Sequence, residues 1–253
     1  MSGAVIYREL SPCAPLRALL RCCWSLRGNG LAAAPPQRVL PDGCADLLFD
    51  FGSAQPQAHW IGTMTRAVVV PPQRGRVDLF GLRFAPGGLH ALLGVPLSDA
   101  TDRRVELHQW SAAWARELMD RLAAEPSPTA RLRHVETALL RQRPNTDALG
   151  AVTALATLER DRLPAGVRDL AARWGLTERT LERRFGVWLG VRPKQHLRYL
   201  RFERLLPHLL GGESCAALAT DFGFAVQSHL IREVRAFADA SPTELVRENP
   251  RRG

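Results

Sequence analysis

The sequence lacks the features that mark a membrane or an exported protein. No run of about 18 apolar residues occurs, so no transmembrane helix is expected. The N-terminal stretch MSGAVIYREL has no basic start followed by an apolar segment, which argues against an export signal. We therefore expect a cytoplasmic protein without a membrane partner.

Cysteine is scarce and irregularly spaced. The 253 residues contain five cysteines, an odd number with no C-x-x-C pair, which argues against a disulfide framework and a zinc site. They are Cys13, Cys22, Cys23, Cys44 and Cys215. Free cysteine behaves as a small apolar residue, so we expect reduced, partly buried thiols, no metal and no cofactor.

The motifs of common enzyme classes are also missing. The seven histidines form no H-x-x-E-H or H-E-x-x-H group, and the chain has neither a G-x-S-x-G elbow nor a P-loop. A DNA-repair alkyl acceptor would need a four-cysteine zinc site, and the chain lacks that spacing. The sequence therefore predicts no catalytic residues and no enzyme activity.

Net charge says little about where a partner binds. The formal charge of +9 favours an acidic partner such as nucleic acid, but the basic excess is similar on both sides of residue 150. Lys194 is the only lysine, so arginine, which suits bidentate contacts to phosphate or guanine, fills every other basic role. Charge alone does not locate a DNA-binding surface.

Residues 1–97 have the pattern of a small β domain. A P-D-G turn signal lies at 41–43, a β-branched run at Ala67–Val70 stops at two prolines, and Arg76–Phe84 alternates as a half-buried strand does. Several short strands with Gly and Pro punctuation predict a small barrel or sandwich.

Residues 98–148 are expected to form a helical hairpin. In His108–Ala124 four apolar side chains recur at four-residue spacing and so share one helical face: Trp110, Trp114, Leu118 and Leu122. A second amphipathic helix is predicted at Arg131–Arg141, after two prolines. The hairpin is a connector or a dimerisation surface, or it packs on the β domain; the sequence leaves these alternatives open.

Residues 149–253 read as an all-α domain, which makes the predicted fold class α+β. The predicted helices are Val152–Arg160, Val167–Trp174, Glu178–Trp188, Pro193–Leu210, Ser214–Asp221, Gln227–Phe237 and Pro242–Arg247. Within them, Asp169–Phe185 and Ala217–Val234 share one layout: short helix, aromatic residue, glycine, apolar residue, polar turn, second helix.

The repeated layout is typical of a helix-turn-helix unit. The first helix needs small residues so that the second can cross it closely, and the turn needs a residue that tolerates positive φ. Alanines in each first helix, with Gly175 and Gly223 at the turns, meet both needs. The expected cores are Leu170, Trp174, Leu176, Leu181 and Phe185 in one unit and Leu218, Phe222, Phe224, Leu230 and Val234 in the other.

The remaining positions of each second helix are predicted to point outward. They carry side chains of the types that read base edges and phosphates in double-stranded DNA. These are Arg179, Thr180, Glu182 and Arg183 in the first unit, and Gln227, Ser228, His229, Arg232 and Glu233 in the second.

The helix predicted at Pro193–Leu210 sets the distance between the units. At about 1.5 Å per residue it spans about 27 Å, and adjacent major grooves on one face of DNA lie about 34 Å apart. With its flanking turns, such a helix could hold two readers in consecutive grooves, so that one chain would suffice to bind DNA.

At these residues, from about Val152 to Asn249, the chain resembles the DNA-binding domain of the AraC/XylS family of bacterial transcription regulators. The resemblance rests on LAARWGLTERTLERRF, on GVRPKQHLRYLRFERLLPHL, which is similar to the family's G-x-S-P-x-x-Y-L connector, and on GF-AVQSHLIREV followed by Ser-Pro. It implies base contacts at Arg179, Glu182 and Arg183, and at Gln227, Ser228 and Arg232. Glutamate suits cytosine and arginine suits guanine.

The second unit departs further from the family pattern than the first. Apart from Arg192, which replaces the connector serine, the departures lie here: the family's Asp near Val226 and Gly at Asp239 are absent. Its phenylalanines are replaced by Leu230, Val234 and Ala238. Smaller core residues predict looser packing or weaker sequence reading in this unit.

The N-terminal segments VLPDGCADLLFDFG and RVDLFGLRFAPGGLHALLGVP resemble an uncharacterised domain found ahead of some regulators of this family. This resemblance does not indicate which effector, if any, the domain binds. In better-known relatives an N-terminal β barrel binds a small effector, so we expect a sensor domain, with a cupin-like barrel as one form. Candidate ligand residues are Asp42, Cys44, Asp46 and Arg83, although Asp42 could be a turn residue and Arg83 a paired strand charge. Cys44 as a redox sensor would need a lowered thiol pKa.

Other partners and one rival function stay open. RNA polymerase, a small-molecule effector and a second copy of the chain are partners that the resemblance allows. The rival is a helical module that binds protein rather than DNA. Strong salt dependence of binding would favour DNA, and salt-independent capture of a partner would favour the rival.

Overall fold

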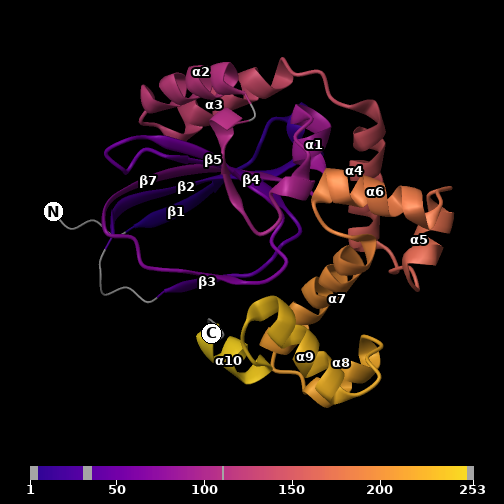
Figure 1. Cartoon of the computed structure of the whole chain (residues 1–253). Coiled ribbons are helices and arrows are strands. Elements are labelled where there is room, and N and C mark those ends of the chain that lie inside the picture. Colours follow the sequence, from indigo (N-terminus) through magenta and orange to yellow (C-terminus); the bar gives the residue numbers. More distant parts are fainter. Residues whose placement is uncertain (1–4, 31–35, 110, 250–253) are drawn as a thin grey trace.

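The computed structural model describes residues 5–30, 36–109 and 111–249, and it has the predicted α+β class (Figure 1). An antiparallel β domain comes first and helices follow. The strands are β1 (Ile6–Leu10), β2 (Leu20–Gly30), β3 (Gln37–Val39), β4 (Ala45–Asp50), β5 (Gln57–Ile61), β6 (Val68–Val70), β7 (Gly75–Phe84) and β8 (Arg104–Glu106).

Within the described residues, six strands form one antiparallel sheet in the order β1-β2-β7-β4-β5-β8, and β3 and β6 form a separate ribbon. The alternation predicted for β7 is confirmed, because Phe80, Leu82 and Phe84 are all fully buried on one face. The larger sheet is open, with β1 and β8 at its edges, so the described strands do not close the barrel that was one predicted form. Its last strand, β8, follows the domain boundary expected at residue 97.

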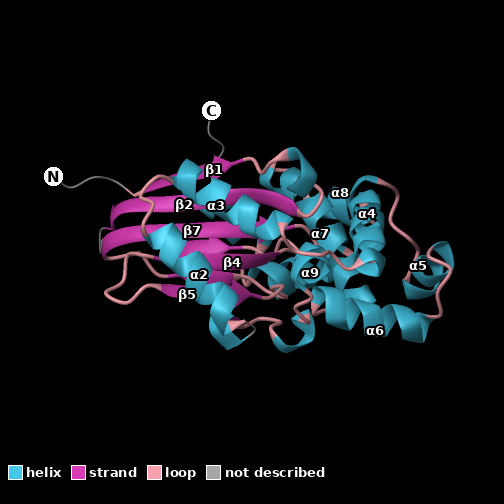
Figure 2. Cartoon of the chain, turned by 90° about the horizontal axis from the view of Figure 1, so that it is seen from above, coloured by secondary structure: helices cyan, strands magenta, loops and turns pink. Residues whose placement is uncertain are grey.

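The helical hairpin packs on the buried face of this sheet (Figure 2). It consists of α2 (Ala112–Ala123) and α3 (Pro128–Leu140), and α1 (Gly88–Leu93) precedes it. Helix α3 begins at Pro128, earlier than predicted, because proline is well suited to the first turn of a helix. Trp110, expected on the first hairpin helix, lies outside the described residues.

The predicted order of C-terminal helices is confirmed. They are α4 (Thr146–Arg160), α5 (Val167–Arg173), α6 (Glu178–Leu189), α7 (Pro193–Leu210), α8 (Cys215–Asp221), α9 (Gln227–Ala238) and α10 (Pro242–Glu248). Helix α4 starts six residues before its predicted first residue because Asn145 caps it, accepting a hydrogen bond from the Ala148 N–H at 3.1 Å. None of the described helices is long and apolar enough to cross a bilayer.

Candidate nucleic-acid interface

The first helix-turn-helix unit consists of α5 and α6, and the backbone conformation and hydrogen bonds between them form its turn. Gly175 has φ +62°, as the turn requires. The next N–H, of Leu176, donates to the carbonyl of Ala171 at 2.9 Å and ends α5. Thr177 then caps α6, accepting a hydrogen bond from the Thr180 N–H at 3.2 Å.

The second unit, α8 and α9, repeats this closure. Gly223 has φ +69°, and the Phe224 N–H donates to the carbonyl of Ala219 at 2.8 Å. One difference is the start of the second helix: α9 follows Val226, which is 55% exposed and provides no side-chain cap. Valine offers no side-chain acceptor for the first N–H groups of the helix, so the first turn of α9 is less firmly held than that of α6.

The predicted cores of both units are confirmed. Leu170, Leu181 and Phe185 in the first unit, and Leu218, Leu230 and Val234 in the second, are fully buried. The aromatic residues beside them are half-buried or buried and pack against this core: Trp174, Phe222 and Phe224.

The predicted DNA-reading residues lie on the first two turns of each second helix. Seven are exposed: Arg179, Glu182, Arg183, Gln227, Ser228, His229 and Arg232. Thr180 is half-buried instead, because its hydroxyl lies 2.9 Å from that of Thr177 inside the helix cap. The seven exposed side chains therefore form two sets, three residues on α6 and four on α9.

The prediction that Glu233 points outward is wrong. Glu233 is buried and receives two hydrogen bonds from the Arg198 guanidinium, Nε to Oε1 at 2.9 Å and Nη2 to Oε2 at 2.8 Å. This ion pair joins α9 to α7. No local pattern indicates this pair, because its two residues lie on different helices.

Helix α7 contributes to both units. Its first half packs His196 against Phe185 of α6, with ring centroids 5.8 Å apart, and its middle stacks Phe202 on Phe237 of α9 at 5.1 Å. His196 is fully buried, and burial lowers its pKa to about 4, so the imidazole is neutral at physiological pH. One rigid helix therefore sets the geometry of both recognition helices.

Segments that precede the DNA-binding domain hold the C-terminal end of each recognition helix. At α6, the Thr101 hydroxyl donates to the carbonyl of Gly190. At α9, the Ala67 N–H donates to the carbonyl of Phe237 at 2.6 Å. Sequence reasoning did not find these contacts, because they join residues more than 80 positions apart.

Arg38 of β3 adds four hydrogen bonds at the same end of the molecule. Its Nη1 donates to the carbonyls of Ala238 at 2.9 Å and Asp239 at 3.2 Å, and its Nε and Nη2 bind the Glu248 carboxylate at 2.9 and 3.2 Å. A cation at the C-terminal end of a helix interacts favourably with the helix dipole. The β3–β6 ribbon is thus fastened to α9 and α10.

The four candidate ligand residues come together in the β domain. The Arg83 guanidinium lies 3.1 Å from Asp42 and 3.4 Å from Asp46, and Asp42 accepts the Cys44 N–H at 3.0 Å. Asp42 is therefore a turn residue and Arg83 a paired strand charge. Burial raises the pKa of Asp46 to about 6, although Arg83 beside it acts in the opposite direction.

Cys44 does not have the environment of a reactive thiol. It is buried, and burial raises its thiol pKa well above the usual value. We expect iodoacetamide at neutral pH to alkylate Cys44 in the folded protein at least about tenfold more slowly than the half-buried Cys215, because only the thiolate reacts. Peptide mass spectrometry would measure both rates, with unfolded protein as the control, and rapid alkylation of Cys44 in the folded protein would restore the redox hypothesis.

Comparisons with known proteins match the two parts of the chain separately. Residues 8–106 match a domain of unknown function (DUF6597), and residues 170–248 match a helix-turn-helix domain. No significant match is found among curated proteins.

Solved structures of ToxT from Vibrio cholerae are similar to the whole chain at a low level. ToxT of strain O395 is 11% identical with a TM-score of 0.40, and 97% of each chain is covered. ToxT of strain SCE256 with a bound unsaturated fatty acid is 11% identical with a TM-score of 0.39, and covers 96% of this chain and 94% of its own. TM-scores this low do not establish a common arrangement of the whole chain.

The helix-turn-helix match covers both units of the C-terminal domain, from α5 to α10. Residues 170–248 thus form an AraC-type helix-turn-helix domain that follows an N-terminal domain of unknown function, and this match supports a DNA-binding transcription regulator.

Proposed function

We propose that the regulator reads DNA with α6 and α9 in consecutive major grooves, and that the N-terminal domain modulates this binding. The observation that carries the first part is that each recognition helix exposes a set of polar side chains on its first two turns. In this proposal Arg179, Glu182 and Arg183 contact bases in one groove. Gln227, Ser228 and Arg232 do so in the next, and Thr180 and His229 assist from the same helices.

The length of α7 supports two readers on one DNA molecule. The helix has 18 residues, which span about 27 Å, against about 34 Å between successive major grooves. Both units pack on this helix, so their spacing is built into the fold and does not depend on a flexible linker. A single chain would therefore contact two grooves without dimerising.

The contacts at the ends of α6 and α9 support modulation by the N-terminal domain. Thr101 reaches Gly190, and Ala67 and Arg38 reach the end of α9, so a shift within the β domain would move one reader relative to the other. We assign residues 1–97 to a sensor domain, 98–148 to a helical linker whose strand β8 pairs with β5 of the sensor domain, and 149–253 to the DNA-binding domain.

An effector would act through the cluster of Asp42, Cys44, Asp46 and Arg83. Gly43, inside this cluster, packs against Tyr199 of α7, where an added Cβ would lie 2.7 Å from the ring. A small molecule that engaged Arg83 would therefore disturb the helix that spaces the readers. The proposal also includes a homodimer that forms through the outer side of the hairpin, and a contact of the regulator with RNA polymerase.

Arg183→Ala tests the assignment of the first reader. A duplex of about 20 base pairs, enriched from a random pool by the wild-type protein, covers two helical turns and serves as the probe. We expect Arg183→Ala to lose about 1–3 kcal/mol, or about 5- to 150-fold in affinity, because an arginine–guanine contact disappears. Fluorescence anisotropy would measure it.

Arg232→Ala is the matched variant in the second unit. We expect a smaller loss on the same duplex, because α9 lacks a capped first turn and departs from the family pattern. Full affinity of Arg183→Ala would exclude this residue as a reader. If the wild-type protein enriches no sequence at all, the two-groove proposal itself fails.

A further inference from the structure

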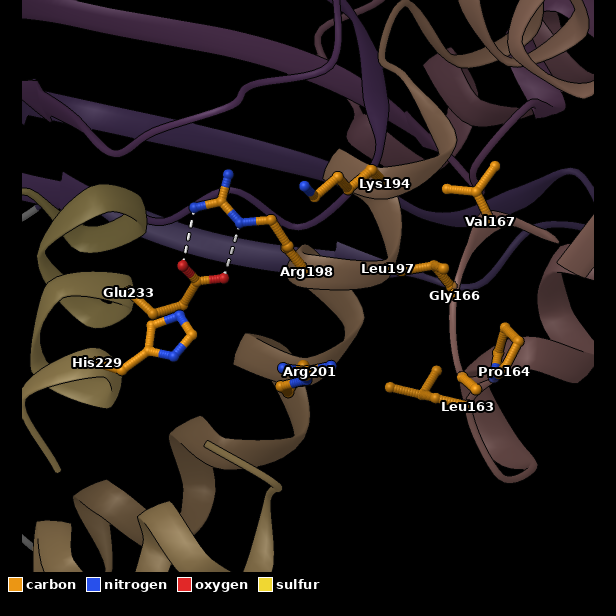
Figure 3. A pocket seen from close by; sticks show the side chains of 11 residues that line it. Leu163, Pro164, Gly166, Val167, Lys194, Leu197, Arg198, Arg201, His229 and Glu233 are labelled. Carbon is orange, nitrogen blue, oxygen red and sulfur yellow. Dashed lines mark hydrogen bonds and ion pairs between the residues drawn. The ribbon is translucent and has the colours of Figure 1, made fainter. Parts of the chain in front are cut away.

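A cavity lies between the two helix-turn-helix units. Its volume is about 500 Å³, and three segments line it: the loop at 163–167 that leads into α5, the first half of α7, and one side of α9 (Figure 3). The His229 side chain, which belongs to the second recognition helix, lies in its wall. The cavity therefore adjoins the surface that we propose reads DNA.

The wall of the cavity carries unbalanced positive charge. Lys194 and Arg201 both line it from α7, about two turns apart, and neither forms an ion pair within the part of the chain that the structure describes. Arg198 lies between them, but the Glu233 carboxylate neutralises it through two hydrogen bonds. The local excess is thus two charges.

Aromatic contacts hold these polar groups in place. The Arg201 guanidinium lies 5.4 Å from the centroid of the Phe224 ring, and the His229 imidazole meets the same ring edge-on at 5.4 Å. Phe224 thus orders a cation from α7 and a ring from α9. Groups ordered in advance lose less side-chain entropy when a ligand binds.

The position of the cavity suggests what would fill it. Two readers in consecutive major grooves have the minor groove between them, bordered by the two sugar–phosphate backbones. A basic hollow between the readers would therefore meet phosphates. Phosphate contacts fix the register of a protein on DNA and carry no sequence information.

We propose that this cavity docks the DNA backbone between the two grooves, with Lys194 and Arg201 as its phosphate contacts. The inference rests on the two-reader function proposed above and adds a sequence-independent contact to it. The third cation, Arg198, is paired with Glu233, and this pair holds α9 against α7. Arg198 and Glu233 therefore position the two helices and do not contact DNA.

The salt dependence of binding tests this inference. For wild type, Lys194→Gln and Arg201→Gln, affinity is measured between 50 and 200 mM salt, on the enriched duplex and on an unrelated duplex of equal length. Each lost phosphate contact should lower the slope of log K against log salt by about 0.9. The affinity ratio between the two duplexes should stay unchanged, because the contact carries no sequence information.

Two matched variants separate this effect from changes in charge or folding. Arg116→Gln removes one exposed charge from α2, on the far side of the molecule from the cavity (Figure 1), and should leave the slope unchanged. Arg201→Lys keeps the charge and should retain the wild-type slope. Thermal unfolding of each variant checks that the fold is intact.

The possible outcomes are distinct. Unchanged slopes in Lys194→Gln and Arg201→Gln, while Arg183→Ala still loses affinity for the enriched duplex, would overturn the backbone site and leave the two readers standing. A lowered affinity ratio would also overturn it, because the residues would then read sequence. Equal binding of both duplexes by the wild type would contradict sequence reading, and the slopes would still decide the backbone contact.

Discussion

Replacing Arg131 with alanine should destabilise the folded protein by about 3–5 kcal/mol, because it leaves a buried carboxylate without its main partner. Arg131 on α3 and Asp78 on β7 are 2% and 3% exposed as side chains. The guanidinium binds both carboxylate oxygens, Nη1 to Oδ1 at 2.6 Å and Nη2 to Oδ2 at 3.1 Å. The pair joins the helical hairpin to the sheet.

Arg131 also contacts three other groups around it. Its Nε donates to the carbonyls of Leu122 and Glu125 at 3.0 and 2.7 Å, and the guanidinium lies 4.1 Å from the Phe51 ring centroid. These carbonyls end α2 and begin the turn to α3, so the variant also loosens the hairpin. Arg27 on the neighbouring strand β2, 3.3 Å from Asp78, offsets part of the loss.

Urea unfolding followed by circular dichroism measures this effect. Arg121→Ala is the matched control, because it breaks an exposed pair with Glu117 on the same hairpin and should cost about 0.5 kcal/mol or less. The double variant Asp78→Leu with Arg131→Met should recover most of the stability, since apolar residues often replace a buried ion pair at little cost. If the free energy of unfolding of Arg131→Ala were within about 1 kcal/mol of the wild-type value, the buried ion pair would not stabilise the fold as proposed.

The helical half was largely predictable because its signals are local. Helix α7 spans the predicted residues, bounded by Pro193 at its start and Gly211 after its end. The turn glycines adopt the positive φ that their positions required. Side-chain type along one helix identified the exposed reading positions, since the buried positions recur with the helical period.

What the sequence could not show are contacts between distant segments. Glu233 has the polarity of an exposed residue, and only its pairing with Arg198 explains its burial. The strand order and the late strand β8 depend on pairings between residues far apart in the chain. The fastening of Arg38 to α9 and α10 spans 200 residues or more and has no local signature.

Gly190→Ala should show how firmly the N-terminal domain holds the first recognition helix. Gly190 ends α6 with φ +75°, where a side chain costs about 1–2 kcal/mol. An added Cβ would also lie 2.6 Å from the Leu97 carbonyl oxygen and 2.7 Å from the Thr101 hydroxyl. Overpacking of this kind adds about 1–3 kcal/mol, so we expect a total loss of about 2–5 kcal/mol.

Gly175→Ala separates the two causes, because Gly175 has φ +62° but nothing within 4 Å of the added carbon. It should cost only the conformational part, about 1–2 kcal/mol. The difference in unfolding free energy between the two variants then measures the close contact between α6 and the segment at Leu97–Thr101. If both variants lost the same unfolding free energy in urea, the Leu97–Thr101 segment would accommodate the added carbon at no measurable cost. In that case the N-terminal domain could modulate DNA binding only through its contacts with α7, α9 and α10, since its hold on the first reader would be weak.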